Sequence, residues 1–133
     1  MENRLYDLTN LEEYKLHLYK LIDGQAVATI DAGMTYDGLV FSMSTNAQIN
    51  WSNFPIIPEG SFPIPINTID DTASYLLTYA NRLNFWGAAL TCKNTALQTG
   101  NYKKGLVRAC TTIEELDTLK QTINLSLWDL FYL

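Results

Sequence analysis

Apolar residues recur at three- and four-residue steps near the start of the chain, at Leu11, Tyr14, Leu18, Ile22, Ala26 and Ile30. This spacing places one apolar stripe on a helix. Thr9 or Asn10 can cap its first turn, and the acidic pair Glu12 and Glu13 suits the positive end of the helix dipole. Gly33 is a natural stop, because glycine adopts the left-handed conformation without steric cost. The pattern predicts a helix from Leu11 to about Gly33.

The periodicity then changes to that of short strands. Residues 34–43 are aromatic and β-branched, and Asp37-Gly38 is a hairpin turn dipeptide. We expect strands over Met34–Tyr36 and Leu39–Met43. Ser44 or Thr45 then caps a short helix, which Pro55 ends because the residue before a proline is disfavoured in helical geometry.

All four prolines lie in residues 55–68, which are therefore expected to be extended, with an edge strand around Phe62–Ile66. This stretch serves either as a connection or as a partner-binding arm. A long helical region is expected to begin at Thr68, with Asp70 and Asp71 in its first turn and these apolar residues following: Ala73, Leu76, Leu77, Ala80, Leu83 and Trp86.

The helical pattern weakens at Gly100-Asn101, which either breaks the helix or bends it. A capping box then predicts a new helix, with Thr111 paired to Glu114 or Thr112 paired to Glu115. The expected fold class is therefore α+β and mostly helical, with one small β-hairpin between an N-terminal helix and a long C-terminal helical region. We expect one helix–hairpin–helix domain over residues 1–124, followed by an apolar C-terminal tail over residues 125–133.

Composition narrows the classes of function. The net charge is −5, with 14 acidic and 9 basic residues, so the basic footprint of a nucleic-acid-binding protein is missing. No segment is apolar for the roughly 18–20 residues of a membrane span, and the first residues do not form a secretion signal. We expect synthesis in a cytoplasm and no nucleic-acid or membrane partner. Charged residues make up only 17% of the chain and aromatic residues 12%, so the aromatic side chains either fill the core or face a partner.

The sequence offers no constellation for catalysis or for metal or cofactor binding. His17 is the only histidine and is expected at the surface or half-buried in the first helix. Cys92 and Cys110 lack metal-ligand spacing and are expected to be free, semi-buried thiols. The paired carboxylates all lie in predicted first helical turns, where the helix dipole accounts for them. No phosphate loop or calcium loop occurs. We therefore predict no enzyme activity and no cofactor.

The last residues of the sequence are almost continuously apolar. Such a segment docks either on its own domain or on a neighbouring subunit. The predicted partner-binding residues are Trp128, Leu130, Phe131 and Leu133, with Phe62 and Ile64 as a second candidate patch.

Three features in a fixed order resemble a known family. The helix leading into residues 30–44 and the Asp37-Gly38 hairpin come first, Ala47-Gln48 follows, and residues 109–116 close the pattern. This order, over roughly residues 15–120, resembles an uncharacterised domain family found in bacteriophage tail-fibre and other tail-associated proteins. The proline-rich stretch departs from the family pattern, and the tail after Ile123 has no counterpart in it.

The resemblance implies no catalytic residues. It implies a structural or assembly role in a virion, as a tail- or fibre-associated adaptor that self-associates and contacts other phage structural proteins. The alternative is a small cytoplasmic phage regulatory protein that binds and inhibits a host protein. A third possibility is a small-molecule pocket under the hairpin of Tyr36 and Phe41.

Overall fold

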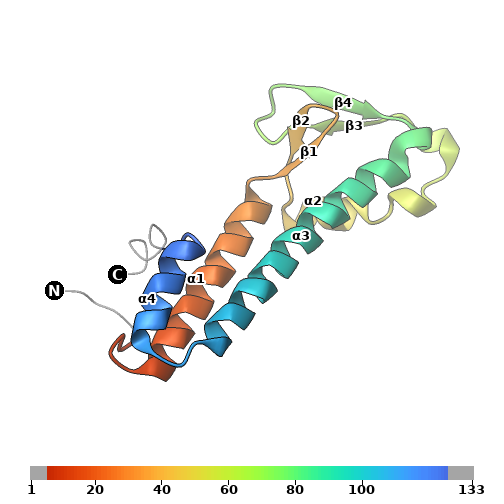
Figure 1. Ribbon diagram of the computed structural model, residues 1–133. Helices are drawn as coiled ribbons and strands as arrows, with labels where there is room; N and C mark the ends of the chain where they lie inside the picture. The colour runs from red at the N-terminus through yellow and green to blue at the C-terminus, as the bar shows by residue number, and fades with distance from the viewer. Residues whose placement is uncertain (1–5, 126–133) are drawn as a thin grey trace. The chain divides into compact units, whose positions relative to one another are not determined.

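The computed structural model describes residues 6–125; residues 1–5 and 126–133 lie outside the described part (Figure 1). The described residues form four α-helices and two antiparallel two-stranded sheets, which confirms a mostly helical α+β fold. The chain divides into two compact units. Of the described residues, 6–28 and 96–125 belong to unit 1, and 29–95 belong to unit 2. Helices α1 (Leu11–Asp31) and α3 (Arg82–Ala109) each supply residues to both units.

Unit 1 packs α1, α3 and α4 (Ile113–Thr122) around one apolar core (Figure 1). The predicted stripe of α1 forms much of this core, which also receives Val107 from α3 and Leu116 from α4. Asn10 caps α1 as expected, because its Oδ1 accepts the Glu13 N–H at 3.1 Å. The core consists of these buried residues: Tyr14, Leu18, Leu21, Ile22, Val107, Cys110, Leu116, Ile123 and Leu125.

Helix α3 continues through Gly100, so this glycine does not break it. Gly100 is buried, and a Cβ there would lie 3.6 Å from Ile22 Cγ2 and 3.8 Å from Ala26 Cβ. The small residue therefore allows α1 and α3 to approach closely in unit 1. Polar contacts flank this approach: Lys104 Nζ lies 2.5 Å from Asp23, and Lys103 Nζ donates to Gln25 Oε1 at 2.9 Å.

The start of α4 is fixed by the capping box of Thr112 and Glu115. The Glu115 N–H donates to Thr112 Oγ1 at 3.1 Å, and the Glu115 carboxylate accepts from the Thr111 N–H at 3.2 Å. The Thr111 hydroxyl also donates to this carboxylate at 2.7 Å. These hydrogen bonds from Thr111, and weaker ones from Thr112, hold the pKa of Glu115 below its ordinary value. Of the two predicted pairings, the structure adopts Thr112 with Glu115.

Unit 2 begins with the predicted hairpin. Strands β1 (Met34–Tyr36) and β2 (Leu39–Phe41) pair antiparallel, with Thr35 opposite Val40. The turn residues Asp37 and Gly38 both have positive φ, at 52° and 77°. Strand β2 ends two residues earlier than predicted. Helix α2 (Thr45–Trp51) follows, capped by Ser44 as expected: the Ala47 N–H donates to Ser44 Oγ at 3.2 Å.

The predicted helix beginning at Thr68 is wrong, because this segment forms a second hairpin. Strands β3 (Ile64–Asn67) and β4 (Ser74–Leu77) pair antiparallel. Asp70 does not open a helix: its Oδ1 accepts the Thr68 hydroxyl at 2.8 Å and the Thr72 N–H at 3.1 Å, which closes a turn. Asp71 has a φ of 58°, which a right-handed helix cannot accommodate. Helix α3 begins only at Arg82, after a 3₁₀ turn over Tyr79–Asn81.

Aromatic rings fill the core of unit 2 around Phe85. The ring of Phe85 is fully buried, and its centroid lies 4.9 Å from that of Trp51, the shortest of its ring contacts. The other rings in contact with it are Tyr36 at 5.3 Å, Phe41 at 5.2 Å and Phe54 at 5.9 Å. Aromatic residues therefore build this core, as one of the two interpretations of the composition expected.

Candidate interaction site

The first candidates for a functional site are the side chains most often used in catalysis or metal binding, those of His, Cys, Asp and Glu. His17, expected at the surface or half-buried, is in fact buried in α1, with its ring centroid 5.9 Å from that of Tyr6. The neighbouring helical turn supplies core residues of unit 1, which accounts for its burial. Over residues 6–125, no group of three or more His, Cys, Asp or Glu side chains is placed to hold a metal ion.

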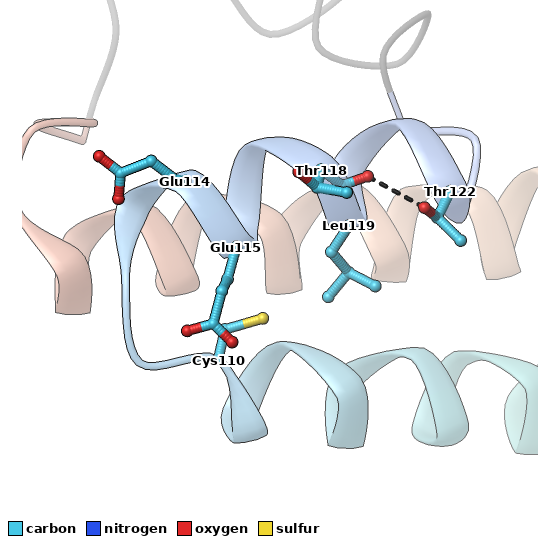
Figure 2. A pocket seen from close by; sticks show the side chains of 6 residues that line it. All are labelled: Cys110, Glu114, Glu115, Thr118, Leu119 and Thr122. Atoms are coloured by element: carbon cyan, nitrogen blue, oxygen red, sulfur yellow. Dashed lines mark hydrogen bonds between the residues drawn. The ribbon is translucent and has the colours of Figure 1, made fainter.

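A hollow of about 420 Å³ lies beside α4 in unit 1, and Figure 2 shows the six residues that line it: Cys110, Glu114, Glu115, Thr118, Leu119 and Thr122. The Glu115 carboxylate is committed to the helix cap. Thr122 donates its hydroxyl proton to the Thr118 carbonyl at 3.0 Å. Cys110 Sγ lies 3.4 Å from the Leu106 carbonyl, and burial, followed by the charge of Glu115, raises the pKa of its thiol. The cysteine is therefore held as a thiol, which is a poor nucleophile.

We expect Cys110 to react with iodoacetamide at neutral pH at least about tenfold more slowly in the folded protein than in the unfolded chain. The reason is its burial and its raised pKa. Mass spectrometry of peptides after timed alkylation measures the rate, and the same reaction in guanidinium provides the reference. Equal rates in both states would show an activated or freely accessible thiol and would contradict the burial of Cys110.

A groove of about 480 Å³ runs between α2 and α3 in unit 2. Most of its residues come from the sides of these helices that do not enter the core, and Trp86 also packs against the core of unit 2. On α2, Trp51 is buried against Phe85, so Ile49, two positions earlier, faces outward and is 58% exposed. On α3, Phe85 and Ala89 enter the core, and the groove receives the next stripe. The lining residues are Thr45, Gln48, Ile49, Ser52, Trp86, Leu90 and Lys93.

Lys93 is the single charged residue of this groove. The sequence has no charged residue from Gly38 to Pro58, and no acidic residue from Thr72 to Ile113. Within residues 6–125, Lys93 forms no ion pair with a carboxylate. The groove therefore combines an apolar wall of Ile49, Trp86 and Leu90 with one unpaired cation.

A second hollow of unit 2, of about 630 Å³, lies between β1 and the first turns of α3. It carries no charged side chain; its residues are Met34, Thr35, Leu83, Asn84, Gly87, Ala88, Thr91 and Cys92. Cys92 Sγ lies 3.8 Å from the Gly33 carbonyl. Tyr36 and Phe41, the residues of the pocket considered under the first hairpin, have their rings 5.3 and 5.2 Å from the ring of Phe85.

The predicted partner-binding residues fall into two groups. Trp128, Leu130, Phe131 and Leu133 lie outside the described residues. Phe62 and Ile64 are half-buried and pack against the core of unit 2, and Phe62 also contacts the ring of Tyr79 at 5.6 Å.

Leu125, placed in the tail by sequence, is fully buried in the core of unit 1, and its N–H donates to the Lys120 carbonyl at 2.8 Å. The sequence did not indicate the groove residues Ile49, Leu90 and Lys93 as candidates for partner binding. The charge-free run from Gly38 to Pro58 was the sequence signal for the α2 wall of the groove.

Comparison with known proteins returns no match: no family model, curated protein or solved structure resembles this chain significantly. None of the helices in residues 6–125 is both long and apolar enough to cross a membrane. Both cysteines are free, as expected from the sequence.

Proposed function

We propose that this chain is a structural or assembly component that acts through protein–protein contacts and does not catalyse a reaction. The α2–α3 groove carries the proposal. Interface centres are depleted of charge and enriched in aromatic and large apolar residues, and the groove has that composition around Trp86 and Leu90.

Other exposed apolar side chains of unit 2 support the same proposal. Isolated exposed leucines are normal, but a charge-depleted region that exposes several large apolar residues is typical of an interaction surface. Ile56 is 79% exposed and Leu76 is 60% exposed. The exposed large apolar residues of unit 2 are Val40, Ile49, Ile56, Ile69, Leu76, Leu83 and Leu90.

The resemblance of residues 15–120 to a domain family of phage tail proteins supports a more specific proposal. The chain is then a bacteriophage tail- or fibre-associated adaptor, made in the host cytoplasm and incorporated in the virion. It self-associates and contacts other phage structural proteins, and it needs no cofactor. An inhibitor of a host protein would use a similar apolar surface for a different partner.

Quantitative mass spectrometry of purified phage particles separates these two roles. A structural component is expected at a constant copy number per particle, relative to the major capsid protein, before and after a high-salt wash. Copies held by burial of apolar surface resist salt, because screening weakens mainly the contacts between exposed charges. Presence in infected-cell lysate but absence from washed particles would contradict the virion role and favour the host-directed regulator.

A further inference from the structure

We propose that the α2–α3 groove of one copy binds the segment Ser126–Leu133 of a second copy. This inference rests on the proposed assembly function and names the joint that carries it. Three observations lead to it: the chemistry of the segment, the chemistry of the groove, and the charge mismatch between the segment and two further hollows, one beside α4 and one next to β1.

The segment Ser126–Leu133 is mostly apolar and has one charged side chain. Its sequence is Ser-Leu-Trp-Asp-Leu-Phe-Tyr-Leu, in which Asp129 is the only side chain that is charged at neutral pH. Large apolar side chains on both sides of a single carboxylate require a partner surface that is apolar and offers one cation. A surface with a second carboxylate would repel the segment.

The α2–α3 groove matches this requirement. Trp86, Leu90 and Ile49 provide the apolar wall, and Lys93 provides one cation that no carboxylate of residues 6–125 neutralises. A Lys–Asp contact at such a site fixes the register of the segment more than it adds affinity, which comes from burial of the apolar side chains.

The hollow beside α4 and the hollow next to β1 do not match the segment in charge. The hollow beside α4 carries Glu114 and Glu115, whose charges would repel Asp129. The hollow next to β1 is lined by neutral residues and offers no cation. Charge complementarity therefore favours the groove that contains Lys93 over these two hollows.

The segment supplies large aromatic side chains for this contact. Buried aromatic side chains cover roughly 150–250 Å² each, so Trp128, Phe131 and Tyr132 together offer roughly 450–750 Å². A two-fold symmetric pair of copies makes this contact twice.

A charge-swap experiment on the full-length chain tests this proposal. Lys93→Glu and Asp129→Lys each place like charges in the contact, and each is expected to weaken self-association about tenfold in sedimentation equilibrium. The double variant Lys93→Glu/Asp129→Lys is expected to recover most of the loss. An equimolar mixture of the two single variants is also expected to recover it, because both contacts of the mixed pair are then complementary.

Matched controls separate this contact from general effects of charge and hydrophobicity. Arg108→Glu makes the same change in net charge as Lys93→Glu, but in unit 1, and is expected to leave association unchanged. Leu90→Asp is expected to abolish association, whereas Leu76→Asp, on β4 and more exposed, is not. Circular dichroism checks that each variant remains folded.

The outcomes distinguish the inference from the proposed function. If the full-length chain associates but Lys93→Glu and Leu90→Asp associate equally well, the groove is not the joint, although assembly stands. If the double variant recovers association and the mixture does not, the segment binds its own copy, which overturns the contact between copies. If the wild-type chain remains monomeric at high concentration, self-association itself fails, and with it this part of the proposed function.

Discussion

Phe85→Ala is expected to lower the free energy of unfolding by about 3–5 kcal/mol, the range for truncation of a fully buried phenylalanine. Phe85 is fully buried at the centre of the unit 2 core, where four aromatic rings contact it. Its removal takes away apolar burial and the edge-to-face contacts together, and leaves a cavity that the rigid neighbouring rings cannot fill. Guanidinium unfolding followed by near-ultraviolet circular dichroism measures the loss.

Leu83→Ala is the matched control for this prediction. Leu83 lies two residues earlier on the same helix but is 52% exposed, so its truncation is expected to cost less than about 1 kcal/mol. Similar losses for Phe85→Ala and Leu83→Ala would show that unit 2 is not organised around the Phe85 ring.

Gly33→Ala is expected to have the second largest effect. Gly33 has a φ of 95°, a conformation that costs an L-residue about 1–3 kcal/mol. A Cβ at this position would lie 2.6 Å from the Phe41 carbonyl oxygen and 2.9 Å from Val40 Cγ1, so β2 would have to move away. Overpacking of this kind lowers the free energy of unfolding by roughly a further 1–3 kcal/mol. Thermal and guanidinium unfolding of the variant measure the combined loss.

Gly38→Ala separates the two contributions. Gly38 also has a positive φ, at 77°, but a Cβ there would meet no atom within 4 Å. This variant is expected to show only the conformational cost. If Gly38→Ala destabilised the protein as much as Gly33→Ala, the close approach of Gly33 to β2 would contribute nothing to the loss of stability.

Local signals in the sequence predicted the elements whose structure is locally determined. The stripe of α1, the Asp37-Gly38 turn, the Ser44 cap of α2 and the Thr112–Glu115 capping box each depend on residues close together in the chain. In each case one side chain or one backbone conformation fixes the element, so its residues suffice to predict it.

The prediction of a helix from Thr68 to Ala80 was wrong, because the same residue pattern occurs at the start of a helix and in a tight turn. A threonine followed by two aspartates is typical of a helix start and also of a tight turn. Pairing of β4 with β3 decides between them, and β3 lies in the proline-rich stretch, where a strand signal is weak. In β4 the burial alternates, with Leu77 buried and Leu76 exposed, as in a strand packed on one face.

The groove could not be predicted from the sequence because it depends on which helix faces the core occupies. Ile49 and Leu90 belong to amphipathic stretches that could equally have turned these residues inward. Phe85 and Trp51 decide the orientation, since their rings pack together in the core of unit 2. The charge-free run on α2 was visible in the sequence, but its apposition to Lys93 of α3 was not.

The most direct test of the assembly account is the solution mass of the full-length chain, measured by light scattering beside a version cut after Leu125. This cut keeps Leu125, which the core of unit 1 needs, and removes only Ser126–Leu133. The account predicts a discrete oligomer for the full-length chain and a folded monomer, with unchanged helical circular dichroism, for the shortened one. An oligomer of the same mass in both forms, or a monomer in both, would contradict a joint made by residues 126–133.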